Sequence, residues 1–397
     1  MKRHENIISH PADLPRLCAD ISAAGAIGLD TEFVGEQTYH PVLCLVQVAL
    51  PDQLVIVDPL KTGPLDELWA TLADPRVTVV CHAAREEIRA CQLALGRTFA
   101  RCFDVQIAAG LTGTDYPMSY ARLVQLLLEV KLTKLETLTD WRMRPLTTRQ
   151  LRYAFDDVRY LLPLHGILHE QLHRMDRLEW LVEECGRLAH VVTDEKVAEE
   201  RWWRLPALGK LKPAQLAVAR ELFRWREGRA EELQRPVRSI MRDETLVDLA
   251  RSDQVTMQDL ATIRGLAKRD LGPILEVIHA ARGLPPDAWP ARQPASVDPP
   301  QLSMLVDLLQ AVVAQLSFQM RIAPGLIATT KELRELARSV VLRQELPAGM
   351  LLGHGWRMQH LRPMLESVLH GTQGLRVANP RAQAPLEWLP GSKETKK

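Results

Sequence analysis

Short apolar runs are the clearest pattern in the first part of the chain. Four of them are rich in Val, Ile and Leu and are bounded by Pro, Gly or Asp, which is typical of buried strands. The predicted strands are 26–33, 42–50, 54–57 and 77–81. The first three follow one another with short breaks, so we expect them to form a meander.

Helical periodicity takes over after the fourth run. The predicted helices of this region are 86–95, 105–111, 120–130 and 148–174. Strands that come first and helices that then cover them indicate an α/β domain with a mixed sheet.

From residue 213 onward the apolar spacing is helical throughout. Pro213 is suited to the first turn of a helix, and a Pro-rich segment at 284–301 is typical of a semi-rigid linker. The predicted helices on the two sides of this linker are 238–250, 256–263, 273–282, 302–314, 330–342 and 359–369. We therefore predict three domains, at 1–200, 209–285 and 300–378.

The composition is that of a soluble globular protein, with 46% hydrophobic and 25% charged residues in 397. We find no run of 18 apolar residues and no signal-peptide core, so no membrane span and no membrane partner is expected. The six cysteines form no CxxC pair, which argues against a zinc site and favours reduced thiols in the cytoplasm.

Charge is distributed unevenly, although the net charge is only +1. Residues 1–200 sum to about −8, whereas residues 201–285 sum to about +5 and residues 286–397 to about +4. This division fits metal chemistry in the N-terminal part of the chain and polyanion binding in the C-terminal part. Ordinary solvated faces explain the same charges equally well.

Two carboxylates stand one residue apart at the end of the first strand, in the run AIGLDTEF. Residues i and i+2 of a strand point the same way, so Asp30 and Glu32 share one face. Their repulsion and desolvation are costly unless a divalent cation such as Mg²⁺ or Mn²⁺ binds them. A solvated strand edge is the simpler reading of the pair alone.

A third carboxylate comes from the helix that follows the fourth strand. Glu87 borders the apolar stripe of that helix, whereas Glu86 lies nearly opposite the stripe and should face water. An inward-leaning carboxylate without a local partner is a candidate metal ligand.

Tyr153 and Asp157 form the last candidate pair. They are i and i+4 in a helical segment and so share a face, while Asp156 points elsewhere. Taken alone, a packed tyrosine and a surface charge explain this pair better than a site does.

Together these segments resemble the tyrosine subclass of the DEDD superfamily of 3′-to-5′ exonucleases, and more closely the ribonuclease D family. The motifs that carry the resemblance are LDTEF at 29–33, YHPVLCLVQ at 39–47, HAAREE at 82–87, DWRMRPL at 140–146 and LRYAFDDVRYLL at 151–162. Residues 213–284 resemble an HRDC domain and residues 302–376 a more divergent helical domain of the same family. The resemblance implies an α/β ribonuclease H-like exonuclease domain followed by two all-α, HRDC-like domains.

The resemblance also implies a mechanism with two divalent metal ions, Mg²⁺ or Mn²⁺. Asp30 is expected to bridge both ions, Glu32 and Asp157 to hold the ion that activates water, and Glu87 to help hold the second. Tyr153 is expected to orient the attacking water. By the same resemblance, Thr31 and Phe33 lie beside the 3′-terminal nucleotide, although a core position explains Phe33 equally well.

The expected activity is trimming of single-stranded RNA 3′ ends, those of tRNA precursors in particular. Two alternatives stay open. Carboxylates and metal ions do not read the 2′-hydroxyl, so DNA is a second possible substrate. The family has Asp where this chain has Glu87, so the third possibility is a nucleic-acid-binding protein whose nuclease site is weakened.

Overall fold

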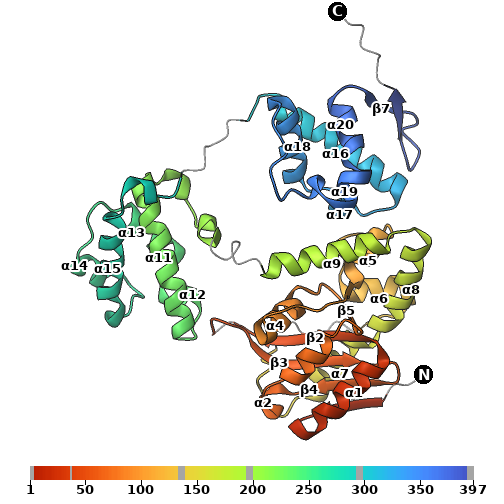
Figure 1. Ribbon diagram of the computed structural model, residues 1–397, viewed down its shortest axis with the longest axis horizontal. Coiled ribbons are helices and arrows are strands. Elements are labelled where there is room, and N and C mark those ends of the chain that lie inside the picture. The colour runs from red at the N-terminus through yellow and green to blue at the C-terminus, as the bar shows by residue number, and fades with distance from the viewer. Residues whose placement is uncertain (1–3, 36–37, 133–138, 194–199, 292–297, 391–397) are drawn as a thin grey trace, which may run out of the picture.

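A six-stranded mixed sheet organises the first part of the chain (Figure 1). The structure is a computed structural model that describes residues 4–35, 38–132, 139–193, 200–291 and 298–390. The strands are β1 (His4–Ile8), β2 (Ala26–Val34), β3 (Val42–Ala49), β4 (Gln53–Val57), β5 (Thr78–Cys81) and β6 (Cys102–Asp104). Their order across the sheet is β1-β4-β3-β2-β5-β6.

The meander predicted from the sequence is confirmed. Strand β3 is antiparallel to both β2 and β4. The remaining pairs are parallel, with β1 beside β4, β5 beside β2 and β6 beside β5. The carboxyl ends of β2, β5 and β6 therefore lie at one edge of the sheet, where Asp30 and the start of the helix that follows β5 meet.

Helices cover both faces of this sheet. They are α1 (Leu14–Ala24), α2 (Pro59–Thr62), α3 (Asp66–Leu72), α4 (Arg85–Leu95), α5 (Val105–Leu111), α6 (Tyr120–Leu128), α7 (Thr148–Arg159), α8 (Leu161–Arg174) and α9 (Leu178–Thr193). Residues of α1, α3 and α4 share one apolar core with Leu29, Val46 and Val48 of the sheet. Residues of α7 and α8 share another core with Leu45, Ala49 and Ile56 on the opposite face.

A second group of helices has a core of its own. It contains α11 (Pro213–Glu232), α12 (Val237–Ile240), α13 (Asp243–Arg251), α14 (Met257–Thr262) and α15 (Leu271–Arg282). Pro213 opens α11 at its first turn, as predicted. The β2–β3 connection reaches this group, since the Tyr39 hydroxyl lies 3.2 Å from Glu227 Oε2 and His40 Nε2 lies 3.5 Å from Glu231 Oε1, both on α11.

The C-terminal group of helices packs on the sheet domain rather than standing apart (Figure 1). It contains α16 (Leu302–Met320), α17 (Pro324–Ile327), α18 (Thr330–Leu342), α19 (Gly355–His360) and α20 (Arg362–Leu369), followed by a hairpin of β7 (Gln373–Val377) and β8 (Leu386–Pro390). Arg357 of α19 donates two hydrogen bonds to the buried carboxylate of Glu184 on α9. The hairpin adds a small sheet to a group that the sequence predicts as helical only.

One helix is long and apolar enough to cross a membrane. Helix α16 has 19 residues and a mean hydropathy of 1.4. It contacts α17, α18 and α20, and Leu302, Leu309 and Val312 on it are fully buried. These contacts are those of a core helix in a helical bundle.

Candidate active site

Three of the predicted carboxylates lie close together between β2 and α7. Asp30 and Glu32 project from β2 and Asp157 projects from α7, and one oxygen of each lies within 4.8 Å of the others. All three side chains are half-buried. Among the residues that the structure describes, this is the one group of three or more acidic, His or Cys side chains with such spacing.

The packing of β2 explains why α7 can approach so closely. Gly28 is two residues before Asp30 and so shares its face. A Cβ atom on Gly28 would lie 3.0 Å from Leu161 Cβ and 3.1 Å from Ala49 Cβ. The absent side chain therefore lets the α7–α8 junction rest directly on the strand.

Helix α7 is fixed at both ends. At its start, Thr147 and Gln150 form a reciprocal capping box, and Arg144 just before it makes two bonds of 2.6 and 2.7 Å to the Asp58 carboxylate. At its end, the Tyr120 hydroxyl accepts the Tyr160 N–H at 3.1 Å and donates to the Asp156 carbonyl at 3.3 Å. These contacts set where Asp157 lies.

Glu87 approaches the site from the other face of the sheet. It is buried on α4, as predicted, while Glu86 is exposed. Its carboxylate accepts a 2.7 Å hydrogen bond from the Thr31 hydroxyl, and Thr31 points to the α4 side of β2. Glu87 lies outside the 4.8 Å group, so the structure brings three of the four predicted ligands together and holds the fourth beside them.

The electrostatics of the site oppose ionisation. Burial raises the pKa of Asp30 well above its ordinary value, and the charges of Glu87, Asp157 and Glu32 raise it further. Burial likewise raises the pKa of Glu32 to about 8 and those of Asp157 and Glu87 to about 7. A perturbed acidic cluster of this kind is a functional-site candidate on physical grounds.

The other two predicted site residues with ring side chains lie nearby. Tyr153 stands one turn before Asp157 on α7, and burial together with the charges of Asp157, Glu32 and Asp30 raises the pKa of its hydroxyl. Its ring lies 5.9 Å from that of Trp141. Phe33 is partly buried against the core on the α4 side of the sheet, so part of its ring is exposed.

Sequence reasoning missed a carboxylate that builds the scaffold of the site. Asp104 is 1% exposed and accepts backbone N–H groups from Ala83, Ala84, Gln106 and Ile107. It thereby caps α5 and ties it to the turn that starts α4. An Asp between a short strand and the helical run VQIAAGL is the capping signal that could have identified it.

The donor set suits a hard divalent cation. Carboxylate oxygens are the ligands that Mg²⁺ and Mn²⁺ prefer. Asp157 Oδ2 is buried and has no hydrogen-bond partner within the described residues, so it is free to bind a cation. A cation here would also relieve the repulsion that raises the pKa values of the cluster.

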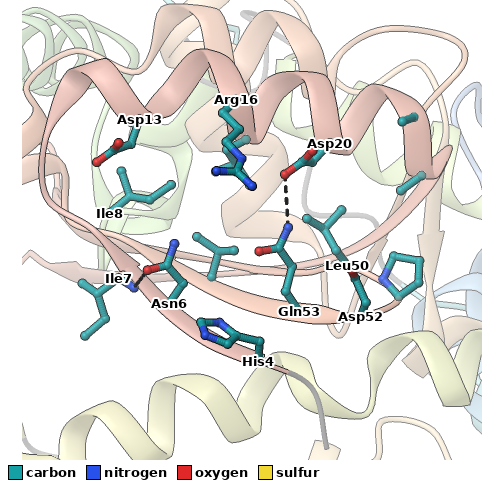
Figure 2. A pocket seen from close by; sticks show the side chains of 15 residues that line it. His4, Asn6, Ile7, Ile8, Asp13, Arg16, Asp20, Leu50, Asp52 and Gln53 are labelled. Atoms are coloured by element: carbon teal, nitrogen blue, oxygen red, sulfur yellow. Dashed lines mark hydrogen bonds between the residues drawn. The ribbon is translucent and has the colours of Figure 1, made fainter. Parts of the chain in front are cut away.

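A separate hollow lies away from these carboxylates. Its volume is about 820 Å³, and it is located between α1 and the β1–β4 edge of the sheet (Figure 2). Asp13, Arg16 and Asp20 line it, and Gln53 donates a 3.2 Å hydrogen bond to Asp20. None of the predicted site residues lines this hollow, so it is separate from the candidate active site.

Two family models match the chain. A 3′-5′ exonuclease model matches residues 6–173 and an HRDC domain model matches residues 215–280. Ribonuclease D of Gluconacetobacter diazotrophicus is 33% identical over 88% of this chain and 89% of its own length. Ribonuclease D of Pseudomonas paraeruginosa is 33% identical over 91% of this chain and 96% of its own.

Solved structures give the same comparison in three dimensions. The crystal structure of Escherichia coli RNase D, described as an exoribonuclease involved in structured RNA processing, superposes with a TM-score of 0.82 at 28% identity. The match covers 93% of this chain and 99% of that one. The sheet domain and both helical groups therefore have counterparts in that structure.

Proposed function

Because the chain belongs to the ribonuclease D family of 3′-5′ exoribonucleases, we propose that it removes nucleotides at the cluster of Asp30, Glu32 and Asp157. Enzymes of this exonuclease family depend on divalent metal ions. The observation that carries the proposal is the 4.8 Å convergence of three carboxylates from elements far apart in the chain, with raised pKa values.

In this proposal the carboxylates hold two ions, Mg²⁺ or Mn²⁺. The charges of Glu87, Asp157 and Glu32 all act on Asp30, so Asp30 would be the carboxylate shared by both ions. When bound, such a pair of ions polarises the scissile phosphate and stabilises the attacking and leaving oxygens. Glu87 approaches from the α4 side and is proposed to support the second ion.

Tyr153 is proposed to orient the attacking water. In the metal-free chain its raised pKa keeps the hydroxyl protonated at neutral pH, which favours a hydrogen-bonding role over that of a general base. Tyr153 stands one turn before Asp157 on α7, so its hydroxyl is on the side of the cluster. Phe33 is proposed to contact the terminal nucleotide, whereas Thr31 acts on the substrate indirectly, because its hydroxyl is used by Glu87.

The proposed substrates are single-stranded RNA 3′ ends, in particular those of tRNA precursors. The description of the Escherichia coli relative as acting in structured RNA processing supports this class. We propose domains at 1–200, 209–285 and 300–378, with the central one acting as an HRDC-type binding module. All six cysteines are unpaired, which supports a reducing, cytoplasmic location.

The test is a ladder assay on a 5′-labelled single-stranded RNA and its DNA counterpart, with Mg²⁺ or Mn²⁺ added after chelation. We expect stepwise shortening of the RNA from its 3′ end. Asp157→Asn should abolish it, whereas Asp156→Asn, which alters the adjacent carboxylate on another face of α7, should retain it. Full activity in purified Asp30→Ala protein contradicts the proposed site. Preferred laddering of DNA would instead assign a DNA exonuclease.

One observation favours a second candidate function, a binding protein with a weakened nuclease site. The Thr31 bond keeps Glu87 outside the group of three carboxylates. Under this candidate, neither RNA nor DNA is shortened, and Glu87→Asp raises activity strongly. If the wild-type chain already shortens RNA and Glu87→Asp changes the rate less than about tenfold, the candidate is rejected.

A further inference from the structure

Gln47 is the unusual residue of strand β3. It is 0% exposed, and its neighbours in the strand are apolar, as the sequence VLCLVQVA shows. Both polar atoms of its side chain, Nε2 and Oε1, lack a hydrogen-bond partner within the described residues. Buried amides are almost always hydrogen-bonded in native proteins, so an unpaired one calls for a physical reason.

The sheet register places this amide beside the candidate active site. Gln47 pairs directly with Asp30 on β2 and with Ile56 on β4. Directly opposed residues of antiparallel strands lie on the same face, with Cβ atoms about 4.5–5.5 Å apart. A glutamine side chain spans that distance, so Nε2 can reach the Asp30 carboxylate.

The rest of that face offers the amide no polar neighbour on its own strand. Leu45 and Ala49 are apolar and cannot bond the amide, and both belong with Ile56 to the apolar core beneath α7 and α8. Asp30 is thus the polar residue that the register brings to Gln47.

We propose that Gln47 is a positioning residue for the metal site, an inference that rests on the function proposed above. Within the residues that the structure describes, Nε2 has no partner in the metal-free chain. When cations bind, it donates a hydrogen bond to one Asp30 oxygen, and this bond holds the carboxylate in the orientation in which it binds them. Residues that orient metal ligands in this way commonly change metal affinity or activity by about 10- to 100-fold when they are removed.

A purely structural role predicts the opposite pattern of effects. An unpaired buried amide destabilises the metal-free fold, so an apolar residue of similar shape should pack as well or better. If Gln47 acts only through packing, its replacement by Met leaves the affinity for metal unchanged, whether or not stability changes. If it positions Asp30, its replacement lowers metal affinity and leaves the metal-free stability equal or higher.

The experiment compares Gln47→Met with wild type and with Leu45→Met, a control on the same strand and face, opposite Glu32. Mn²⁺ binding to the full chain is measured by calorimetry without nucleic acid, and thermal unfolding is measured in EDTA. We expect Mn²⁺ to bind Gln47→Met about 10- to 100-fold more weakly, with an unchanged or higher unfolding midpoint. Leu45→Met should bind Mn²⁺ like wild type. If Gln47→Met does not fold, Gln47→Leu takes its place in the same comparison.

A further variant separates the two proposals. If wild type binds Mn²⁺ and Asp30→Asn does not, while Gln47→Met binds like wild type, the inference about Gln47 is overturned and the proposed function stands. If Asp30→Asn binds Mn²⁺ as tightly as wild type, both are overturned. A normal affinity in Gln47→Met together with a lowered unfolding midpoint assigns the residue to packing alone.

Discussion

Replacing Glu87 by Gln removes a buried charge and keeps the shape of the side chain. The pKa of Glu87 rises from 4.5 to about 7, because the carboxylate is buried. One pH unit of difference between the folded and unfolded pKa corresponds to about 1.4 kcal/mol, so ionised Glu87 destabilises the metal-free fold by about 3 kcal/mol. The Thr31 hydroxyl can still donate to the amide oxygen of Gln.

The direction of the pH dependence follows from where the proton is held. Between about pH 4.5 and 7 the folded chain keeps a proton on Glu87 that the unfolded chain has lost, so the free energy of unfolding falls as the pH rises. In the Glu87→Gln variant, position 87 has no titrating group. The stability of this variant should equal that of wild type near pH 4 and exceed it by about 3 kcal/mol at pH 8.

Urea unfolding in EDTA across pH 4–8 measures this difference, with Glu86→Gln as the matched control. Glu86 is exposed on the same helix and pairs with Arg89, so its replacement should shift stability by less than about 0.5 kcal/mol at every pH. Adding Mn²⁺ should stabilise wild type more than Glu87→Gln, because a cation offsets the buried charge. If the curves of wild type and Glu87→Gln in EDTA stay parallel from pH 4 to 8, the account of Glu87 is wrong.

Three further predictions concern other contacts. Tyr153→Phe should lower the rate of RNA hydrolysis by about 10²-fold or more without changing Mn²⁺ affinity, as checked by single-turnover kinetics and calorimetry. Arg357→Met should cost about 2–3 kcal/mol in urea unfolding, because the buried Glu184 carboxylate loses both bonds to Arg357 and keeps those to Arg187 and Trp356. Gly355→Ala should lower the thermal midpoint, since φ is +52° and the new Cβ would displace the Glu183 carboxylate that accepts the Trp356 N–H.

The strands that carry the candidate site were predictable because they are buried on both faces. Such strands appear as continuous apolar runs, and β2, β3, β4 and β5 lie within a residue or two of the predicted positions. Strand β1 (HENII) has four exposed residues at the sheet edge, and β6 has only three residues. Neither gives an apolar run long enough to recognise, so both were missed.

Two helix boundaries differ from the prediction. The predicted helix 148–174 is two helices, α7 and α8, divided at Tyr160, whose backbone N–H bonds to the Tyr120 hydroxyl. Pro163 in the first turn of α8 has no N–H for the Arg159 carbonyl, so it was the local signal for this break. The charged sequence after residue 186 predicts a connection between domains, but helix α9 continues to Thr193. Parts of the predicted connections, 194–199 and 292–297, lie outside the described residues.

The sequence predicts which residues face the site, but it does not predict how the elements that carry them are arranged. The period of a strand places Asp30 and Glu32 on one face, and the helical period turns Glu87 inward and Glu86 outward, as the structure has them. Nothing local to the sequence says that α4 and α7 cover opposite faces of the sheet. That arrangement is why Glu87 meets Thr31 instead of joining the three other carboxylates.

Repulsion among the carboxylates of the site and the contacts that anchor α7 act on this helix in opposite directions. Repulsion between Asp157 and the carboxylates of β2 pushes α7 away from the sheet in the metal-free chain. The helix stays in place because Arg144 binds the buried carboxylate of Asp58 at its start and the Tyr120 hydroxyl holds its end. The motif around residues 140–146 therefore helps to position Asp157, although none of its residues is a proposed metal ligand. A site that needs close carboxylates before its cations arrive requires such anchors, since without them the fold would relieve the repulsion by moving the helix outward.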